Sequence, residues 1–135
     1  MNTELARLTA VVNPNRSKAD WCWRLTAILR LARLDHCFSC EDVAQNVDGQ
    51  ATAEDVLRLE QGDFSGEALL PVLDLLGFAS MEAWVRHADQ FLKGLSYDDL
   101  TAKQQTFLHK VEEELQASGK WDRYQLIRAI LKIEL

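Results

Sequence analysis

The chain has 135 residues, of which 47% are hydrophobic and 27% are charged. This balance is that of a globular sequence and excludes a disordered one, and the length suits one compact domain or a small module with an extension. No run approaches the roughly 18 consecutive apolar residues that a bilayer-spanning helix needs, and we see no secretory signal at the N-terminus. We therefore expect a cytoplasmic protein without a membrane segment.

The formal net charge of −6 is unevenly distributed along the chain. Residues 18–80 hold 5 Lys or Arg against 11 Asp or Glu, whereas residues 81–135 hold 8 against 9. The negative excess therefore lies in residues 18–80. A field of this sign favours basic partners and opposes nucleic acid.

The first 34 residues predict two helices. Residues 1 to about 16 read as a short helical start that breaks at Asn13-Pro14-Asn15, because proline disfavours helix in the residue before it. From Ser17 to Leu34 apolar residues recur at three- and four-residue spacing, which is typical of an amphipathic helix. Trp23 lies off this apolar stripe and is predicted to be exposed, as a possible partner contact. The stripe consists of Trp21, Leu25, Ile28, Leu29, Ala32 and Leu34.

Two capping boxes predict the next two helix starts. Ser39 with Asp42 opens one helix, and Thr52 with Asp55 opens the next, since each hydroxyl and each carboxylate satisfies a backbone N–H of the first turn. The second of these helices should end near Gly62.

Helical patterns continue to the end of the chain. A helix is predicted from Glu67 to Leu76, closed by Gly77 with Phe78 folded back onto it. Apolar residues keep a helical spacing up to Gly94, again from residue 100 to 115, and once more after residue 119. With no strand pattern and no internal repeat, the predicted fold class is all-α.

The stretch from Leu29 to Phe78 resembles the XRE family, the helix-turn-helix domain of lambda-type repressors and Cro. Arg33 stands where the family has its first-helix arginine, and Leu59-Glu60-Gln61-Gly62 matches the Ile-Glu-x-Gly ending of the recognition helix. The resemblance covers about 50 of the 135 residues. Three further anchors agree in order, namely the capping Ser39, the buried pair Val43-Ala44 and the closing helix Leu70 to Gly77.

The resemblance implies a lambda repressor-like helix-turn-helix module with a C-terminal helical extension. The expected organisation is an N-terminal arm or short helix over residues 1–17, the module over residues 18–79, and a C-terminal helical region over residues 80–135. It also implies an ion pair between Arg33 and Glu60 that joins the first helix of the module to the third.

As an XRE-type protein, the chain would be a sequence-specific DNA-binding transcriptional regulator, a repressor acting as a dimer. Helix 52–61 would enter the major groove of double-stranded DNA. The residues expected at DNA are Thr52, Ala53, Glu54, Leu57, Arg58, Ser39 and Cys40.

Three features depart from the family pattern at this surface. The turn Val47 to Thr52 is about two residues longer than usual, and Glu54 and Asp55 place carboxylates where phosphates would lie. Cys40 stands where relatives often have a glutamine that contacts a phosphate. The positive charges that attract DNA phosphates would have to come from Arg16, Lys18, Arg24, Arg30 and Arg58.

The C-terminal region is the expected dimer contact, because a two-fold pair reads two half-sites where one short helix reads too few bases. The same apolar residues could instead complete a single core. They are Phe107, Leu108, Val111, Leu115, Trp121, Ile127, Ile130 and Leu131.

The alternative function is an acidic protein-binding module on a helix-turn-helix scaffold that does not bind DNA. Its negative face would engage a basic partner, as an anti-activator, an inhibitor or a mimic of nucleic-acid charge does.

No nucleophile–base pair, phosphate loop or paired carboxylates stand out, so we expect neither an enzyme nor a cofactor. Cys37 and Cys40 form a Cys-x-x-Cys next to His36, with Cys22 as a further thiol. A zinc or redox role remains open, but a single such motif without a second ligand pair favours plain reduced cysteines and no metal.

Overall fold

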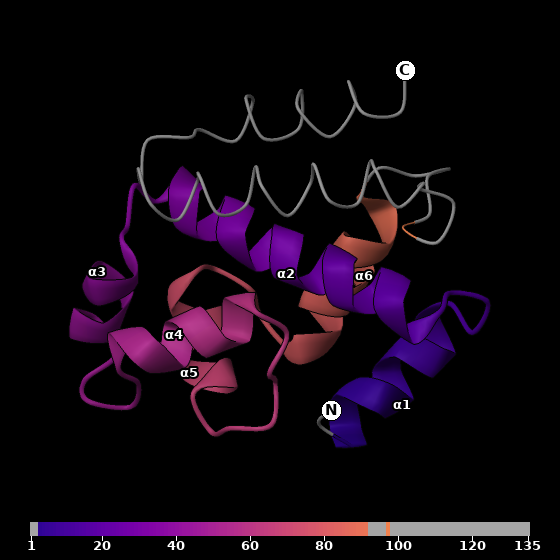
Figure 1. Cartoon of the computed structure of the whole chain (residues 1–135), viewed down its shortest axis with the longest axis horizontal. Coiled ribbons are helices and arrows are strands. Elements are labelled where there is room, and N and C mark those ends of the chain that lie inside the picture. The colour runs from indigo at the N-terminus through magenta and orange to yellow at the C-terminus, as the bar shows by residue number, and fades with distance from the viewer. Residues whose placement is uncertain (1–2, 92–96, 98–135) are drawn as a thin grey trace.

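The computed structural model describes residues 3–91 and Tyr97 (Figure 1). This part of the chain is all-helical, with no strand. Its helices are α1 (Thr3–Val12), α2 (Lys18–Asp35), α3 (Cys40–Gln45), α4 (Ala53–Glu60), α5 (Leu69–Leu75) and α6 (Met81–Gln90).

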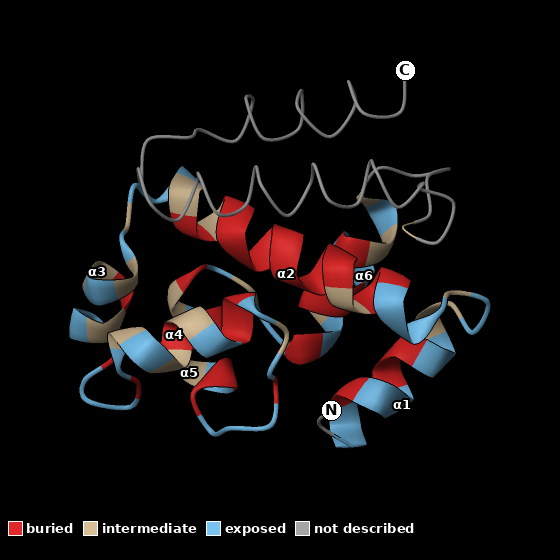
Figure 2. Ribbon diagram, viewed as in Figure 1, coloured by how far each residue is buried: buried red, intermediate tan, exposed pale blue. Residues whose placement is uncertain are grey.

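Helix α2 is the centre of the described fold. It crosses the molecule in Figure 1, with α3, α4 and α5 grouped near one half and α1 near the other end. Helix α2 packs on α6 and α4, while α6 also packs on α1 and α5. Nearly every residue of α2 from Asp20 to Leu31 is buried, which Figure 2 shows as an almost continuous red helix. The other elements are therefore placed by their contacts with α2 and α6.

One apolar core runs through the described helices. It includes Leu5 and Leu8 of α1, Leu25 of α2, and Trp84 and Val85 of α6. Residues from all three expected segments, 1–17, 18–79 and 80–135, thus share a core. The indole N–H of Trp84, which is fully buried, donates to the Leu25 carbonyl at 3.3 Å, so its polar atom is satisfied.

The starts of α3 and α4 follow the two predicted caps, and α2 has a cap that was not predicted. Ser17 caps α2, Ser39 caps α3 and Thr52 caps α4, each accepting a hydrogen bond from a first-turn N–H through its side chain. The predicted helix over residues 67–76 is shorter in the structure, because α5 begins at Leu69 after an Ala68 that offers no side-chain cap.

Three helices end on a residue with positive φ. Cys37 follows α2 with φ 57°, Gly62 follows α4 with φ 95°, and Gly77 follows α5 with φ 96°. After α4, the Gly62 N–H donates to the Leu59 carbonyl and the Asp63 N–H to the Arg58 carbonyl, as in a Schellman motif. A Cβ at position 62 would lie 2.6 Å from the Cys22 sulfur and would displace it, and the positive φ itself favours glycine there.

The prediction that Trp23 is exposed is wrong. Its side chain is buried, because the ring of Phe91 packs edge-on at 6.2 Å and that of Tyr97 lies at 5.4 Å. The covering residues lie more than 60 positions along the chain, so the local apolar period could not reveal them. None of the described helices combines the length and apolarity needed to cross a bilayer.

Candidate macromolecule-binding face

Helices α3 and α4 form a compact pair joined by residues 46–52. The connection reverses direction at Asp48 and Gly49, both of which have positive φ. Val47 and Ala51 anchor this turn by burying their side chains in the core. The pair presents its outer side to solvent, and we call the outer sides of α3, α4 and this turn the α3–α4 face.

Each helix of the pair is fixed at its N-terminus by a complete capping box. The Asp42 carboxylate accepts the Ser39 N–H at 2.8 Å, and the Asp55 carboxylate accepts the Thr52 N–H at 2.9 Å. The serine and threonine oxygens in turn accept the Asp42 and Asp55 N–H groups at 3.1 Å. These hydrogen bonds lower the pKa of both aspartates below its usual value. Two negative charges are therefore built into the α3–α4 face.

The outer side of α4 exposes Glu54 and Arg58. Their side chains are 74% and 53% exposed, and the guanidinium donates to the Glu54 carboxylate at 2.9 Å. A second nitrogen of Arg58 donates to Asp55 at 3.4 Å. One cation is thus shared by two carboxylates, and the helix presents a net negative charge.

The structure places the residues expected at DNA in different environments. Thr52, Glu54 and Arg58 are exposed, whereas Ala53 and Leu57 are half-buried. Ser39 is exposed but its hydroxyl serves the α3 cap, and Cys40 turns its thiol inward to donate to Glu60 at 3.4 Å. A phosphate contact from the Cys40 thiol would have to break that bond.

Most of the cations expected to assist DNA binding are buried or form ion pairs within the fold. Arg24 and Arg30 are buried, with 0% and 2% exposure, and Arg16 is held between Asp20 at 3.0 Å and Asp89 at 2.7 Å. Of the five cations expected to assist DNA binding, Lys18 and Arg58 are exposed, and Arg58 is paired with Glu54 and Asp55.

Glu60 is the buried anchor that orients α4. Arg33 of α2 donates from Nε to Oε2 at 3.0 Å and from Nη2 to Oε1 at 2.9 Å, and Arg30 donates from Nε to Oε1 at 3.2 Å. Burial disfavours the Arg33 charge, but the hydrogen bonds and attraction of Glu60 outweigh it, so the pKa of Arg33 is raised. The structure thus brings Arg33 and Glu60 together, and adds Arg30. Arg30 lies three residues before Arg33 on the same side of the helix, a spacing that could have indicated it.

A second buried ion-pair network was not foreseen from the sequence. Arg24 Nε donates to Asp20 at 3.0 Å, and Arg16 joins Asp20 to Asp89 at the end of α6. Burial lowers the pKa of Arg24, and Asp20 opposes this shift only in part. The four-residue spacings from Arg16 to Asp20 and from Asp20 to Arg24 were the available signal.

None of the three cysteines, all of which lie in the described residues, forms a disulfide. Cys37 is exposed, and Cys40 and Cys22 are half-buried. Burial, and next the negative charge of Glu60, raise the pKa of Cys40 to about 11, so this thiol stays protonated at neutral pH. Within residues 3–91 and Tyr97, no three His, Cys, Asp or Glu side chains are grouped as a metal ion would require.

The expected dimer residues, from Phe107 to Leu131, lie outside the described residues. The chain matches none of the family models, curated proteins or solved structures with which it was compared.

Proposed function

We propose that this protein is an acidic protein-binding module of repressor-like helix-turn-helix architecture, and that its α3–α4 face binds a basic partner protein. The observation that carries the proposal is that the arginines on and beneath the α3–α4 face are already paired with carboxylates. Arg30 and Arg33 are buried around Glu60, and Arg58 is shared between Glu54 and Asp55. A helix-turn-helix surface that reads DNA needs free cations to release counterions from phosphates.

The carboxylates of the face are also preorganised for a basic ligand. Asp42 and Asp55 are held by their capping boxes, and Glu54 projects from the first turn of α4. A lysine or arginine of a partner would meet fixed negative charge, and long-range attraction would accelerate the encounter.

A second candidate function is DNA binding by an XRE-type dimeric repressor. It is favoured by one observation: Arg33 and Glu60, matched to the family pattern, form a two-point ion pair while the outer side of α4 remains exposed. In this candidate, the groove would be faced by Thr52, Ala53, Glu54 and Leu57. Glu54 would accept from a cytosine amino group.

The two candidate functions can be distinguished with two matched charge-reversal variants. Glu54 pairs with Arg58 on α4, and Glu82 pairs with Arg86 on α6 with the same four-residue spacing. Glu54→Lys and Glu82→Lys therefore change net charge equally and differ only in location. An arginine-rich peptide, such as an octa-arginine, is titrated into each protein by calorimetry at low salt.

We expect Glu54→Lys to weaken peptide binding at least fivefold relative to Glu82→Lys. Equal weakening by both variants would mean that the attraction is diffuse and would contradict the proposal. In parallel, the full chain is tested for mobility shift with double-stranded DNA from its own upstream region. A mobility shift whose DNA affinity rises steeply as the salt concentration falls would favour the repressor candidate instead.

A further inference from the structure

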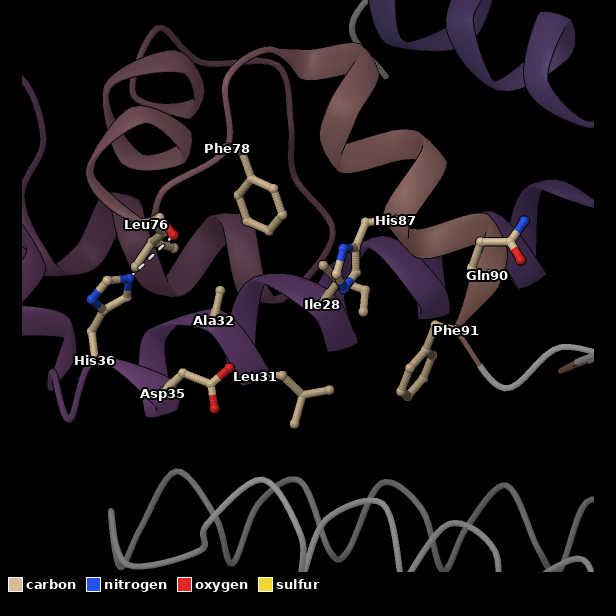
Figure 3. A pocket seen from close by; sticks show the side chains of 10 residues that line it. All are labelled: Ile28, Leu31, Ala32, Asp35, His36, Leu76, Phe78, His87, Gln90 and Phe91. Carbon is tan, nitrogen blue, oxygen red and sulfur yellow. Dashed lines mark hydrogen bonds between the residues drawn. The ribbon is translucent and has the colours of Figure 1, made fainter.

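A cleft of about 520 Å³ lies between the C-terminal half of α2, the end of α5 and α6 (Figure 3). This volume is within the range of sites that hold small organic molecules. Along α2, the cleft is lined by Ile28, Ala32 and His36 at four-residue spacing, so these residues share a side of the helix. Figure 3 shows Ala32 between the two larger side chains, where its single methyl group leaves the space open.

One part of the lining is apolar. Ala32, Phe78 and Phe91 are half-buried and offer apolar surface to a ligand, whereas the other three apolar residues of the lining, Ile28, Leu31 and Leu76, are themselves buried. The Phe78 ring is held by the His87 ring, which packs edge-on at 6.0 Å. A flat or aromatic molecule could therefore lie over Ala32 with its face or edge against Phe78.

The remainder of the lining is polar and consists of Asp35, His36, His87 and Gln90. His36 Nε2 lies 3.2 Å from the Leu76 carbonyl, and because a carbonyl only accepts, this nitrogen carries the proton. The hydrogen bond fixes the His36 ring at the end of the cleft where α2 and α5 stop. His87 and Gln90 are exposed and lie three residues apart on one side of α6, so both can hydrogen-bond to the same ligand.

Asp35 gives the cleft its charge. Among the described residues that line the cleft, it is the one carboxylate, and none of them is a lysine or an arginine. Asp35 is also the last residue of α2, where the helix dipole adds partial negative charge. A carboxylate offers about four acceptor sites, so Asp35 can bind a ligand cation in addition to another partner. The cleft therefore favours a positively charged head group.

We propose that this cleft binds a small amphipathic amine. Its apolar or aromatic body lies over Ala32 beside Phe78, and its ammonium group pairs with Asp35. Polar groups on the body of the ligand hydrogen-bond to His87 and Gln90. The cleft has no residue in common with the α3–α4 face, so this site and the binding of a basic partner protein can be lost separately.

The proposal is tested with two naphthalene derivatives of similar shape and opposite charge. Naphthylmethylamine carries an ammonium at neutral pH, and naphthylacetate carries a carboxylate. Each compound is titrated into the full chain by calorimetry at physiological salt, which screens the diffuse attraction of an acidic protein for any cation. We expect the amine to bind at least fivefold more tightly than the acetate. No binding of the amine, or equal binding of the two compounds, would overturn the proposal.

Two matched variants test the role of Asp35. Asp35→Asn removes the charge of the cleft, and Asp74→Asn removes an exposed carboxylate of α5 that does not line it. Asp35→Asn should weaken binding of naphthylmethylamine at least fivefold, whereas Asp74→Asn should retain the affinity of the parent protein. Equal weakening by the two variants would assign the binding to net charge and contradict the proposal.

The position of the ligand is tested in two further ways. Ala32→Phe should fill the cleft and abolish binding of the amine, with folding checked by circular dichroism. In the parent protein, the amine should shift the nuclear magnetic resonance signals of the His36 and His87 rings and leave those of α4 unchanged. A folded Ala32→Phe protein with the parent affinity, or shifts confined to α4, would place the ligand elsewhere and overturn the proposal.

Discussion

Arg33 holds Glu60 at two points, with Nε and Nη2 donating to different carboxylate oxygens at 3.0 and 2.9 Å. Both side chains are buried, at 9% and 3% exposure, and Arg30 adds a third hydrogen bond to the same carboxylate. The chain thus places two arginines around one glutamate between α2 and α4. Such a cluster is strongly destabilised when one member is removed, because the remaining charges lose their partner.

Glu60→Ala should therefore lower the free energy of unfolding by about 3 kcal/mol, measured by urea denaturation. The exposed pair of Arg58 with Glu54 provides the control, since Arg58→Ala should cost less than about 1 kcal/mol. Replacing the whole cluster with Arg30→Met, Arg33→Leu and Glu60→Leu should recover most of the loss. Equal stability of Glu60→Ala and the parent protein would show that the cluster does not contribute to folding.

Cys37 occupies a left-handed position that suits glycine. With φ 57° at the end of α2, its side chain crowds the backbone, a cost that glycine avoids. We expect Cys37→Gly to raise stability by about 0.5–1 kcal/mol and the melting temperature by a few degrees. Cys37→Val should lower both, because a β-branched side chain tolerates this conformation poorly. A Cys37→Gly protein that melts below the parent would contradict this account.

The capping carboxylates predict a loss of stability in acid. Hydrogen bonds from Ser39 and Thr52 lower the pKa of Asp42 and Asp55, so the folded protein binds their protons less readily than the unfolded chain. Stability from these groups is present above the ordinary aspartate pKa of about 4 and is lost as pH falls through the lower folded values. Urea denaturation at pH 7 and pH 3 should show a smaller difference for the double variant Asp42→Asn, Asp55→Asn. An undiminished difference would assign the acid sensitivity to other groups.

The cysteines should differ in reactivity. Burial, with the charge of Glu60, raises the pKa of Cys40 to about 11, whereas Cys37 is exposed. Iodoacetamide at pH 8 should modify Cys37 well before Cys40, as followed by peptide mass spectrometry. In Glu60→Gln, Cys40 should react faster because the neighbouring negative charge is gone. Equal rates for Cys37 and Cys40 in the parent protein would show that Cys40 is not shielded.

What could be predicted from the sequence was local. The caps at Ser39 and Thr52 depend on residues three positions away, and both boxes form as expected. The all-helical character of the described residues was predicted correctly from the apolar spacing. Helix α5 was placed less well, since Ala68 gives no capping signal.

What was missed depends on distant contacts. The burial of Trp23 comes from Phe91 and Tyr97, and one of the two ion pairs of Arg16 is with Asp89, more than 70 residues away. Periodicity within α2 carries no information on such partners. The cations expected to assist DNA binding were misjudged for the same reason, because a count of arginines does not show that Arg24 and Arg30 are buried.

Gly62 limits which helices could replace α4 in this fold. Its missing side chain leaves room for the sulfur of Cys22, and its positive φ turns the chain sharply after α4. A grafted helix can vary on its outer side, but as long as Arg30 and Arg33 are kept it must place a carboxylate at position 60, and it must be followed by glycine at position 62. Without the carboxylate, Arg30 and Arg33 would lose their ion-pair partner, and without the glycine the chain could not make the tight turn after α4.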